Sequence, residues 1–141
     1  GSGDFALTTG LIESGIYNGS IVGDYDNDGN EDIFFLDNGS QTDVGAPKEN
    51  KLMKNTGPFA FSRITGVPFN TSLSFALSAS WIDVNNDGNL DLFISYLSGS
   101  KLYLGNGSGG FTEKTGDPLV TDLFESFSSP LWADFDNDGD Q

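Results

Sequence analysis

One acidic nine-residue pattern occurs twice in this 141-residue chain and a third time in part. The complete copies are Asp24–Asp32 and Asp83–Asp91, and the partial copy begins at Asp134. Each copy has Asp or Asn at positions 1, 3 and 5 and Gly at position 6, and the complete copies add Asp at position 9. Alternating oxygen side chains around a turn suit a hard cation such as calcium, and the glycine permits the turn. The pattern therefore predicts repeated metal-binding loops.

A second marker repeats with nearly the same period as the acidic loops. It is a six-residue phrase that starts with Phe and ends with Thr-Gly, at residues 5–10, 61–66 and 111–116. Its copies are 56 and 50 residues apart, close to the 59 and 51 residues that separate the first Asp of successive loops. Because two independent markers share one period, the chain is a repeat protein. The period lies at the upper end of the range for β-propeller blades.

Within one period, alternating apolar residues and turn residues predict four short strands. In the first period we expect strands at about 19–25, 31–37, 50–55 and 59–65. In the second period we expect them at about 77–83, 90–97, 101–105 and 110–115. The segment Asn106–Gly110 predicts a hairpin turn between the last two strands of the second period. The predicted fold is all-β, a β-propeller segment of four-stranded antiparallel blades.

The repeats also set the expected limits of each unit along the chain. Residues 1–3 are interpreted as a cloning remnant and residues 4–141 as one propeller segment. We expect an outer strand of a preceding blade at 4–10, blades at 17–66 and 75–116, and the first strand and loop of a further blade at 128–141. Radial architectures close with about 4–8 units, so two full blades with a flanking strand at each end leave both ends exposed. We expect the remainder of a longer chain or self-association to close the propeller.

Other calcium loops fit the pattern less well. The EF-hand shares positions 1, 3, 5 and 6 but needs a bidentate Glu at position 12 and flanking helices. Position 12 is Phe35 in the first loop and Ile94 in the second, and the flanking segments are strand-like. Thrombospondin-type calcium repeats need cysteines, and this chain has none. A polar turn without metal is the other alternative, and two complete copies at blade spacing disfavour it.

With position 9 as the closing carboxylate, each loop offers a defined set of oxygen ligands for Ca²⁺. In the first loop they are the side chains of Asp24, Asp26, Asp28 and Asp32 and the carbonyl of Asn30. In the second they are the side chains of Asp83, Asn85, Asp87 and Asp91 and the carbonyl of Asn89. The third has Asp134, Asp136, Asp138 and the carbonyl of Asp140, and it lacks position 9. Because Asn85 replaces a charged ligand, we expect the second loop to bind calcium more weakly than the first.

Three runs of the second unit carry a family resemblance. They are Trp81-Ile82-Asp83 before the loop, Asp91-Leu92-Phe93-Ile94 after it, and Lys101–Gly107 leading into Gly110-Phe111-Thr112. With these runs the chain resembles FG-GAP/VCBS-type repeats, the calcium-loop blades of β-propellers similar to those of integrin α-subunits. The first unit departs from the pattern by Val22 in place of Trp81 and by a longer link over 38–50. The resemblance implies a calcium role for the loop residues and implies no ligand specificity.

The net charge of −15 narrows the range of partners. Such a surface repels phosphate backbones and anionic lipid, so we expect neither nucleic-acid nor membrane-surface partners. No apolar run approaches membrane-spanning length. Millimolar calcium outside cells suits loops of this kind, which favours an extracellular or cell-surface location.

Catalysis has little support in the composition, because the chain has no His and no Cys. A glycosidase-like carboxylate pair is the catalytic alternative, drawn from Glu13, Asp37, Glu49 and Glu125. We expect no enzyme activity and a role in adhesion or scaffold interaction, with a protein or glycan ligand. A carbohydrate-binding lectin propeller and a non-catalytic part of a larger secreted enzyme are the alternatives.

Several other side chains have a structural interpretation. Trp81 and Trp132 both stand two residues before the first Asp of a loop, which predicts blade-to-blade packing in preference to a sugar-stacking platform. The phenylalanines that open the repeated phrase are interpreted in the same way: Phe5, Phe61 and Phe111. Three lysines are expected to form a solvated edge that discourages strand addition: Lys48, Lys51 and Lys54. Four Asn-x-Ser sequons would accept glycans in a eukaryotic secreted protein: Asn18, Asn38, Asn70 and Asn106.

Overall fold

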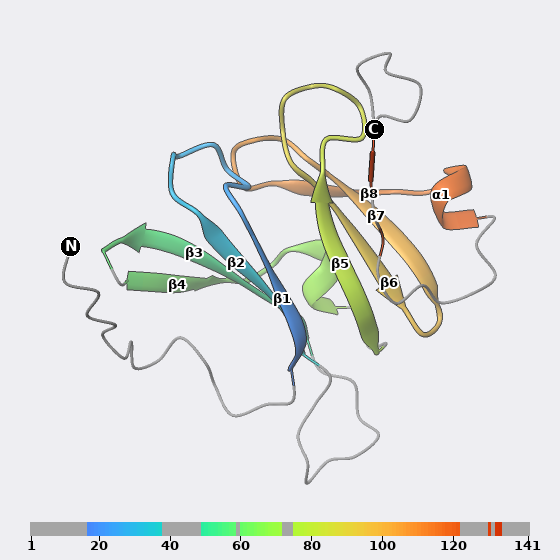
Figure 1. Ribbon diagram of the computed structural model, residues 1–141, viewed down its shortest axis with the longest axis horizontal. Helices are drawn as coiled ribbons and strands as arrows, with labels where there is room; N and C mark the ends of the chain where they lie inside the picture. Colours follow the sequence, from blue (N-terminus) through green and yellow to red (C-terminus); the bar gives the residue numbers. More distant parts are fainter. Residues whose placement is uncertain are drawn as a thin grey trace, which may run out of the picture.

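The computed structural model describes residues 17–37, 49–58, 60–71, 75–121, 130 and 132–133. They form two four-stranded antiparallel sheets in which each strand pairs with the next one along the chain (Figure 1). The first sheet contains β1 (Tyr17–Gly23), β2 (Asp32–Asp37), β3 (Lys51–Gly57) and β4 (Ala60–Ile64). The second contains β5 (Ala76–Ile82), β6 (Asp91–Tyr96), β7 (Gly99–Gly105) and β8 (Phe111–Lys114). The predicted all-β fold of four-stranded antiparallel units is confirmed.

The two sheets repeat each other in detail. Ile33 pairs with Met53 in the first sheet, and Leu92 pairs with Tyr103 at the equivalent place in the second. Both first strands also carry a register irregularity near their start, between Tyr17 and Gly19 and between Ala76 and Ser78. Every predicted strand overlaps an observed one, and no end differs by more than two residues.

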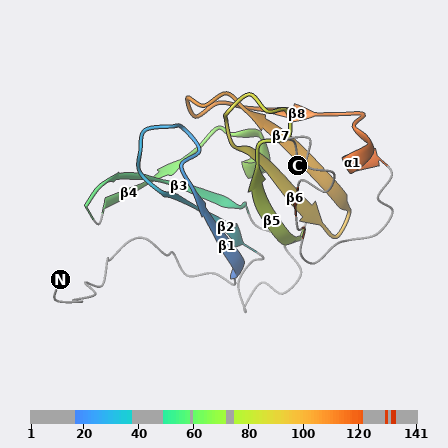
Figure 2. The same cartoon turned by 45° about the horizontal axis from the view of Figure 1, so that its top comes forward.

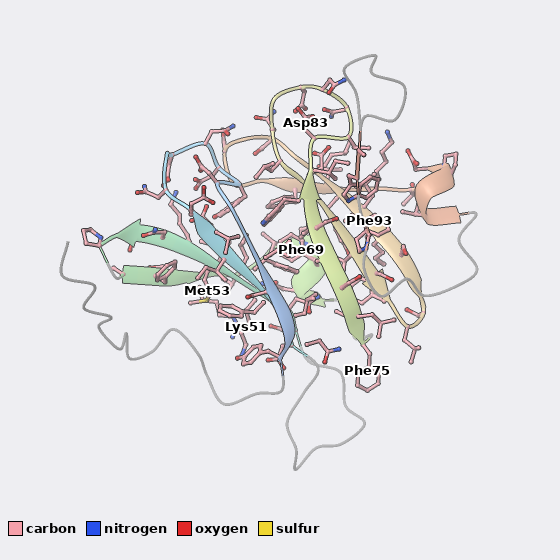
Figure 3. All side chains as sticks on the ribbon, in the orientation of Figure 1. Lys51, Met53, Phe69, Phe75, Asp83 and Phe93 are labelled. Atoms are coloured by element: carbon pink, nitrogen blue, oxygen red, sulfur yellow. The ribbon has the colours of Figure 1, made fainter. Side chains whose placement is uncertain are left out.

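The sheets pack through their first strands, with β1 and β5 side by side in both views (Figures 1 and 2). Between them lies a core of apolar and aromatic side chains from both sheets. Its centre is Phe69, which is fully buried and contacts Phe34, Tyr103 and Phe111 at ring-centroid distances of 5.2–5.5 Å. Figure 3 shows Phe69 between the two sheets. The connection between the units therefore supplies the side chain that fills their interface.

A single helical turn follows the outer strand of each sheet. The first is the 3₁₀ turn η1 (Pro68–Thr71), and the second is α1 (Pro118–Thr121). Proline at the first position suits both turns, because its fixed φ matches the helix and its missing N–H would have no helical partner there. Neither turn approaches a membrane-spanning helix, and no helix among the described residues is long and apolar enough to cross a membrane.

The expected solvated lysine edge is wrong for the two lysines that the structure describes, Lys51 and Lys54. Lys51 is only 7% exposed and lies 3.0 Å from the carboxylate of Asp37 and 2.7 Å from the hydroxyl of Tyr17. Asp37 is itself buried, and a buried carboxylate needs a partner that offsets its lost hydration. Lys54 contacts the first acidic loop. Lys48 lies outside the described residues.

Candidate metal centre

Both complete acidic loops fold around the carboxylate at their first position. Asp24 accepts hydrogen bonds from the backbone N–H groups of Asp28 (3.0 Å) and Gly29 (2.8 Å). Asp83 accepts the equivalent bonds from Asp87 (3.1 Å) and Gly88 (2.8 Å). Short Asp side chains favour such turns because they satisfy backbone donors that the turn leaves free. The loops therefore have the same local structure for the same chemical reason.

Two residues in each loop adopt positive φ, which lets the chain reverse within a few residues. Gly29 and Gly88, at position 6, have φ of 86° and 82°. Asn27 and Asn86, at position 4, both have φ of 56°. Asn is the non-glycine residue best suited to this left-handed region. The sequence therefore specifies the turn at two positions.

The aspartates at position 9, Asp32 and Asp91, are fully buried and link each loop to the third strand of its sheet. Asp32 Oδ1 accepts a hydrogen bond from the Asn55 N–H at 2.7 Å, and Asp91 Oδ1 accepts one from the Gly105 N–H at 2.8 Å. Burial raises the pKa of both carboxyl groups. The hydrogen bonds act in the opposite direction, but their effect is smaller. A buried acid of this kind is more stable as an anion when a cation is close.

The three aspartates at positions 1, 3 and 5 of the first loop lie together. Ligand oxygens of Asp24, Asp26 and Asp28 are within 4.8 Å of one another, and this is the one such acidic group among the described residues. The sequence-predicted Asp32 is not part of that group; it is the first residue of β2. In the second loop Asn85 interrupts the acidic series, and its amide bonds to Asp87 through both its oxygen (3.0 Å) and its nitrogen (3.1 Å).

Two buried oxygens of the first site have no hydrogen-bond partner among the described residues. They are Oδ1 of Asp26 and Oδ2 of Asp32. A buried carboxylate oxygen without a partner is costly, unless an ion or water satisfies it. Carboxylate, amide and carbonyl oxygens are the donors that calcium and magnesium prefer. The residues of the first loop therefore fit a hard divalent cation, while the third loop (Asp134, Asp136, Asp138 and Asp140) lies outside the described residues.

Lys54 is a feature of the first site that sequence analysis missed. Its ammonium group contacts Oδ2 of Asp26 and lies 2.9 Å from Oδ2 of Asp28. The hydrogen bonds that Lys54 donates to these carboxylates, Asp26 first, raise the pKa of Lys54, and the bond to Asp28 lowers the pKa of that carboxyl group. The register of β2 and β3 is what brings Lys54 to the site: when Ile33 pairs with Met53, residue 54 lies beside the loop.

The two acidic loops touch each other at one edge of the sheets. The amide of Asn27 in the first loop donates a hydrogen bond to Oδ1 of Asn89 in the second, at 3.0 Å. Gly107, in the predicted hairpin turn between β7 and β8, lies against the same pair, since a Cβ there would come within 2.0 Å of Asn89 Oδ1 and 2.6 Å of Asn27 Nδ2. Figure 3 shows Asp83 in the loop above β5, on the same side of the molecule as the first loop. Both loops and the hairpin therefore form one layer.

The predicted packing role of the tryptophans is confirmed. Trp81 lies between the sheets, where it stacks on Tyr25 and Phe111 and meets Phe34 edge-on, at centroid distances of 6.2–6.4 Å. Trp132 packs against Phe93 and donates a hydrogen bond to Ser80 Oγ at 2.6 Å. Each tryptophan therefore packs against an aromatic side chain of the preceding unit.

The phenylalanines of the repeated phrase divide between the interface and the surface. Phe111 belongs to the inter-sheet core. Phe61 is half-buried on the first sheet and lines a shallow pocket together with Asn30, Asn55, Gly57 and Pro58. Phe5 lies outside the described residues.

The acidic residues considered for catalysis have other partners where the structure describes them. Asp37 pairs with Lys51, and Glu49 lies 3.0 Å from Arg63. Glu13 and Glu125 lie outside the described residues. The two described carboxylates therefore serve as ion-pair partners of the first sheet.

The described sequons also have structural roles. Asn70 is only 4% exposed and donates a hydrogen bond to the Ile64 carbonyl at 3.0 Å. Asn106 closes the hairpin by accepting hydrogen bonds from Ser108 and Gly110, both at 2.9 Å. Asn18 is exposed and bonds to the Ala76 carbonyl, and Asn38 lies outside the described residues. Burial disfavours a glycan on Asn70.

Comparison with protein families gives one match, which occurs twice along the chain. A family model described as FG-GAP-like repeat matches residues 24–94 and again residues 83–141. Each match begins at the first Asp of a complete acidic loop. No curated protein sequence and no solved structure gave a match.

Proposed function

Because this chain belongs to the FG-GAP-like repeat family, we propose that it is a non-catalytic, calcium-binding β-propeller module in which the metal is structural. The observation that carries the proposal is the first loop, where three carboxylates converge and two buried oxygens of Asp26 and Asp32 have no partner among the described residues. The second loop repeats its fold, with Asn85 as a neutral oxygen donor.

The chain's own residues explain why a cation would stabilise the blade. Asp24 orders the turn through backbone N–H groups, and Asp32 connects the base of the loop to β3 through Asn55. The carboxylates between them repel one another at close range. A bound calcium ion would supply the positive charge that offsets this repulsion and joins β1, β2 and β3 at one end of the blade.

The expected setting is extracellular or at a cell surface, where calcium is abundant. There we propose adhesion or scaffold interaction with a protein or glycan ligand. The layer formed by both acidic loops and the 106–110 hairpin supports this, because it gathers exposed polar groups on one edge of the two sheets. A glycan array and a panel of immobilised extracellular proteins, each probed with and without calcium, would identify the ligand class.

Calcium titration by isothermal calorimetry tests the metal proposal directly. Asp24→Ala and Asp83→Ala should each remove one bound calcium per chain. Glu113→Gln is the matched control, since Glu113 is exposed on the second sheet and pairs with Lys101 away from the loops. The metal assignment would be refuted if both loop variants bind as many calcium ions per chain as the unmodified protein. It would also be refuted if the control loses as many as the loop variants do.

A further inference from the structure

We propose that Lys54 is a tethered cation that competes with calcium for the first loop, so that the second loop binds calcium more tightly than the first. The inference rests on the proposed calcium function and reverses the order of affinity that the sequence alone suggested. It concerns a residue outside the acidic pattern, on β3.

The ammonium group of Lys54 occupies the position of a cation. It contacts Asp26 Oδ2 and lies 2.9 Å from Asp28 Oδ2, two of the three carboxylates that converge in the loop. The side chain of Asp26 is only 8% exposed, so this pair is partly shielded from water. A calcium ion bound beside these oxygens would be repelled by the ammonium group at close range. Calcium therefore binds less tightly while Lys54 stays in contact with them.

Lys54 does not provide a partner for every buried oxygen of the first site. Oδ1 of Asp26 and Oδ2 of Asp32 have no partner among the described residues even with the ammonium in place. A calcium ion takes six to eight oxygen ligands, whereas an ammonium group has three N–H donors. Lys54 therefore offsets part of the negative charge of the loop. The oxygens that it does not contact remain available to a cation that takes more ligands.

Among the described residues, the second loop has no such competitor. The paired strands place Leu104 where Lys54 lies, because Tyr103 pairs with Leu92 as Met53 pairs with Ile33. Within the described chain, no ion pair involves Asp83, Asp87 or Asp91.

The charge difference between the two sets of calcium ligands disappears once Lys54 is counted. The predicted ligands of the first loop include four carboxylates, which Lys54 offsets by one positive charge, and those of the second loop include three carboxylates, so each set carries a net charge of −3. Lys54 thus offsets the charge of the extra Asp in the first loop. Its ammonium group also occupies oxygens that could otherwise bind calcium.

The flexible stem of lysine makes the exchange reversible. Lys54 retains 29% side-chain exposure, so its ammonium group can turn into solvent when calcium enters. Without calcium the first loop keeps an internal counter-ion, whereas the second has unbalanced carboxylates. The second loop should therefore fill first and depend more strongly on the metal.

The test measures calcium affinity in chains with one intact complete loop. The D83A/D134A chain retains the first loop, and the D24A/D134A chain retains the second. Lys54→Met should raise the calcium affinity of the first chain by at least ~10-fold, equivalent to ~1.4 kcal/mol, and leave that of the second unchanged. Lys54→Arg, which keeps the charge, should stay near the parent value, and Lys101→Met controls for loss of a distant lysine.

Thermal unfolding gives a readout that does not depend on affinity fitting. In excess chelator Lys54→Met should lower Tm, because the carboxylates lose their counter-ion, and saturating calcium should restore it. An unchanged or weaker first-loop affinity in Lys54→Met would overturn the inference while leaving the proposed function intact. Absence of calcium binding in the unmodified chain would overturn both.

Discussion

Trp81 of β5 packs edge-on against Phe34 of β2, with ring centroids 6.2 Å apart and an interplanar angle of 65°. The contact recurs one unit later, where Trp132 meets Phe93 at 5.4 Å and 80°. Phe34 and Phe93 are equivalent, since each stands two residues after the last Asp of its loop. The tryptophan before a loop is thus the side chain through which one unit packs on the preceding one.

Replacing Trp81 tests this contact. Trp81→Ala should lower the free energy of unfolding by about 3–5 kcal/mol, because it removes an aromatic side chain from the interface. Trp81→Phe should lose much less, since the indole N–H has no hydrogen-bond partner among the described residues and a ring is kept. Urea denaturation followed by circular dichroism measures both.

Val22 is the matched control for Trp81, because it holds the same repeat position in the first unit. Its side chain is 58% exposed, so Val22→Ala should change stability by no more than about 0.5 kcal/mol. Equal losses for Trp81→Ala and Val22→Ala would contradict the assigned packing role.

The strands and the tryptophan contact could be predicted from the sequence because both depend on local patterns that the repeat shows more than once. Period-2 alternation locates the strands, and the shared place of Trp81 and Trp132 distinguishes packing from ligand binding. The central position of Phe69 could not be predicted in this way. It lies in a connection between units, and its burial results from contacts with residues as distant as Phe34 and Tyr103.

Gly23 and Gly19 on β1 allow a second test of how closely the sheets approach. A Cβ on Gly23 would lie 2.7 Å from Trp81 Cδ1 and 2.9 Å from Leu90 Cδ1, so Gly23→Ala forces two side chains of the other unit to move. We expect a loss of about 1–3 kcal/mol in urea denaturation. Gly19→Ala is the control, because its Cβ would lie at an ordinary 3.8 Å from Leu36 Cδ1. Similar stability of the two variants would contradict the close contact of Gly23 with the second sheet.

The ligand pattern of the loops could also be predicted from sequence, whereas the surroundings of the site could not. Alternating acids and the position-6 glycine are local signals, and both loops have the turn that they specify. The contacts of Lys54 could not be predicted, because its neighbours depend on how β3 pairs with β2. That pairing spans the 38–50 link, across which no local pattern fixes the register.

The buried Asp32 predicts a pH dependence of the calcium-free chain. Burial raises its pKa above 3.8, so the folded chain binds this proton more tightly than the unfolded chain does. Without calcium, stability is therefore lost as the pH rises above 3.8 through the raised pKa. Asp32→Asn removes the ionisation and can keep the bond from Asn55, so in chelator its stability relative to wild type should improve over that window.

Asp28 provides the opposite control for this experiment. The hydrogen bond from Lys54 lowers its pKa, so its contribution to stability is present above 3.8 and is lost as the pH falls through the lowered value. Asp28→Asn should therefore lose stability relative to wild type as the pH rises. Urea denaturation in chelator from pH ~3 to ~7 covers the ordinary range of carboxyl groups. If the stability of wild type and of Asp32→Asn changes with pH in the same way, the pKa of Asp32 is not raised by folding.

Removing calcium should lower the melting temperature of the unmodified chain. A ligand at 100 times its dissociation constant stabilises the folded state by about 2.7 kcal/mol per site. Asp24→Ala and Asp83→Ala should each reduce this calcium-dependent increment. They should also lower stability in chelator, because each carboxylate accepts two backbone N–H bonds without metal. The decisive quantity is therefore the difference in Tm between calcium and chelator for each variant. A melting curve of the unmodified chain that is the same in both conditions would rule out a structural role for calcium.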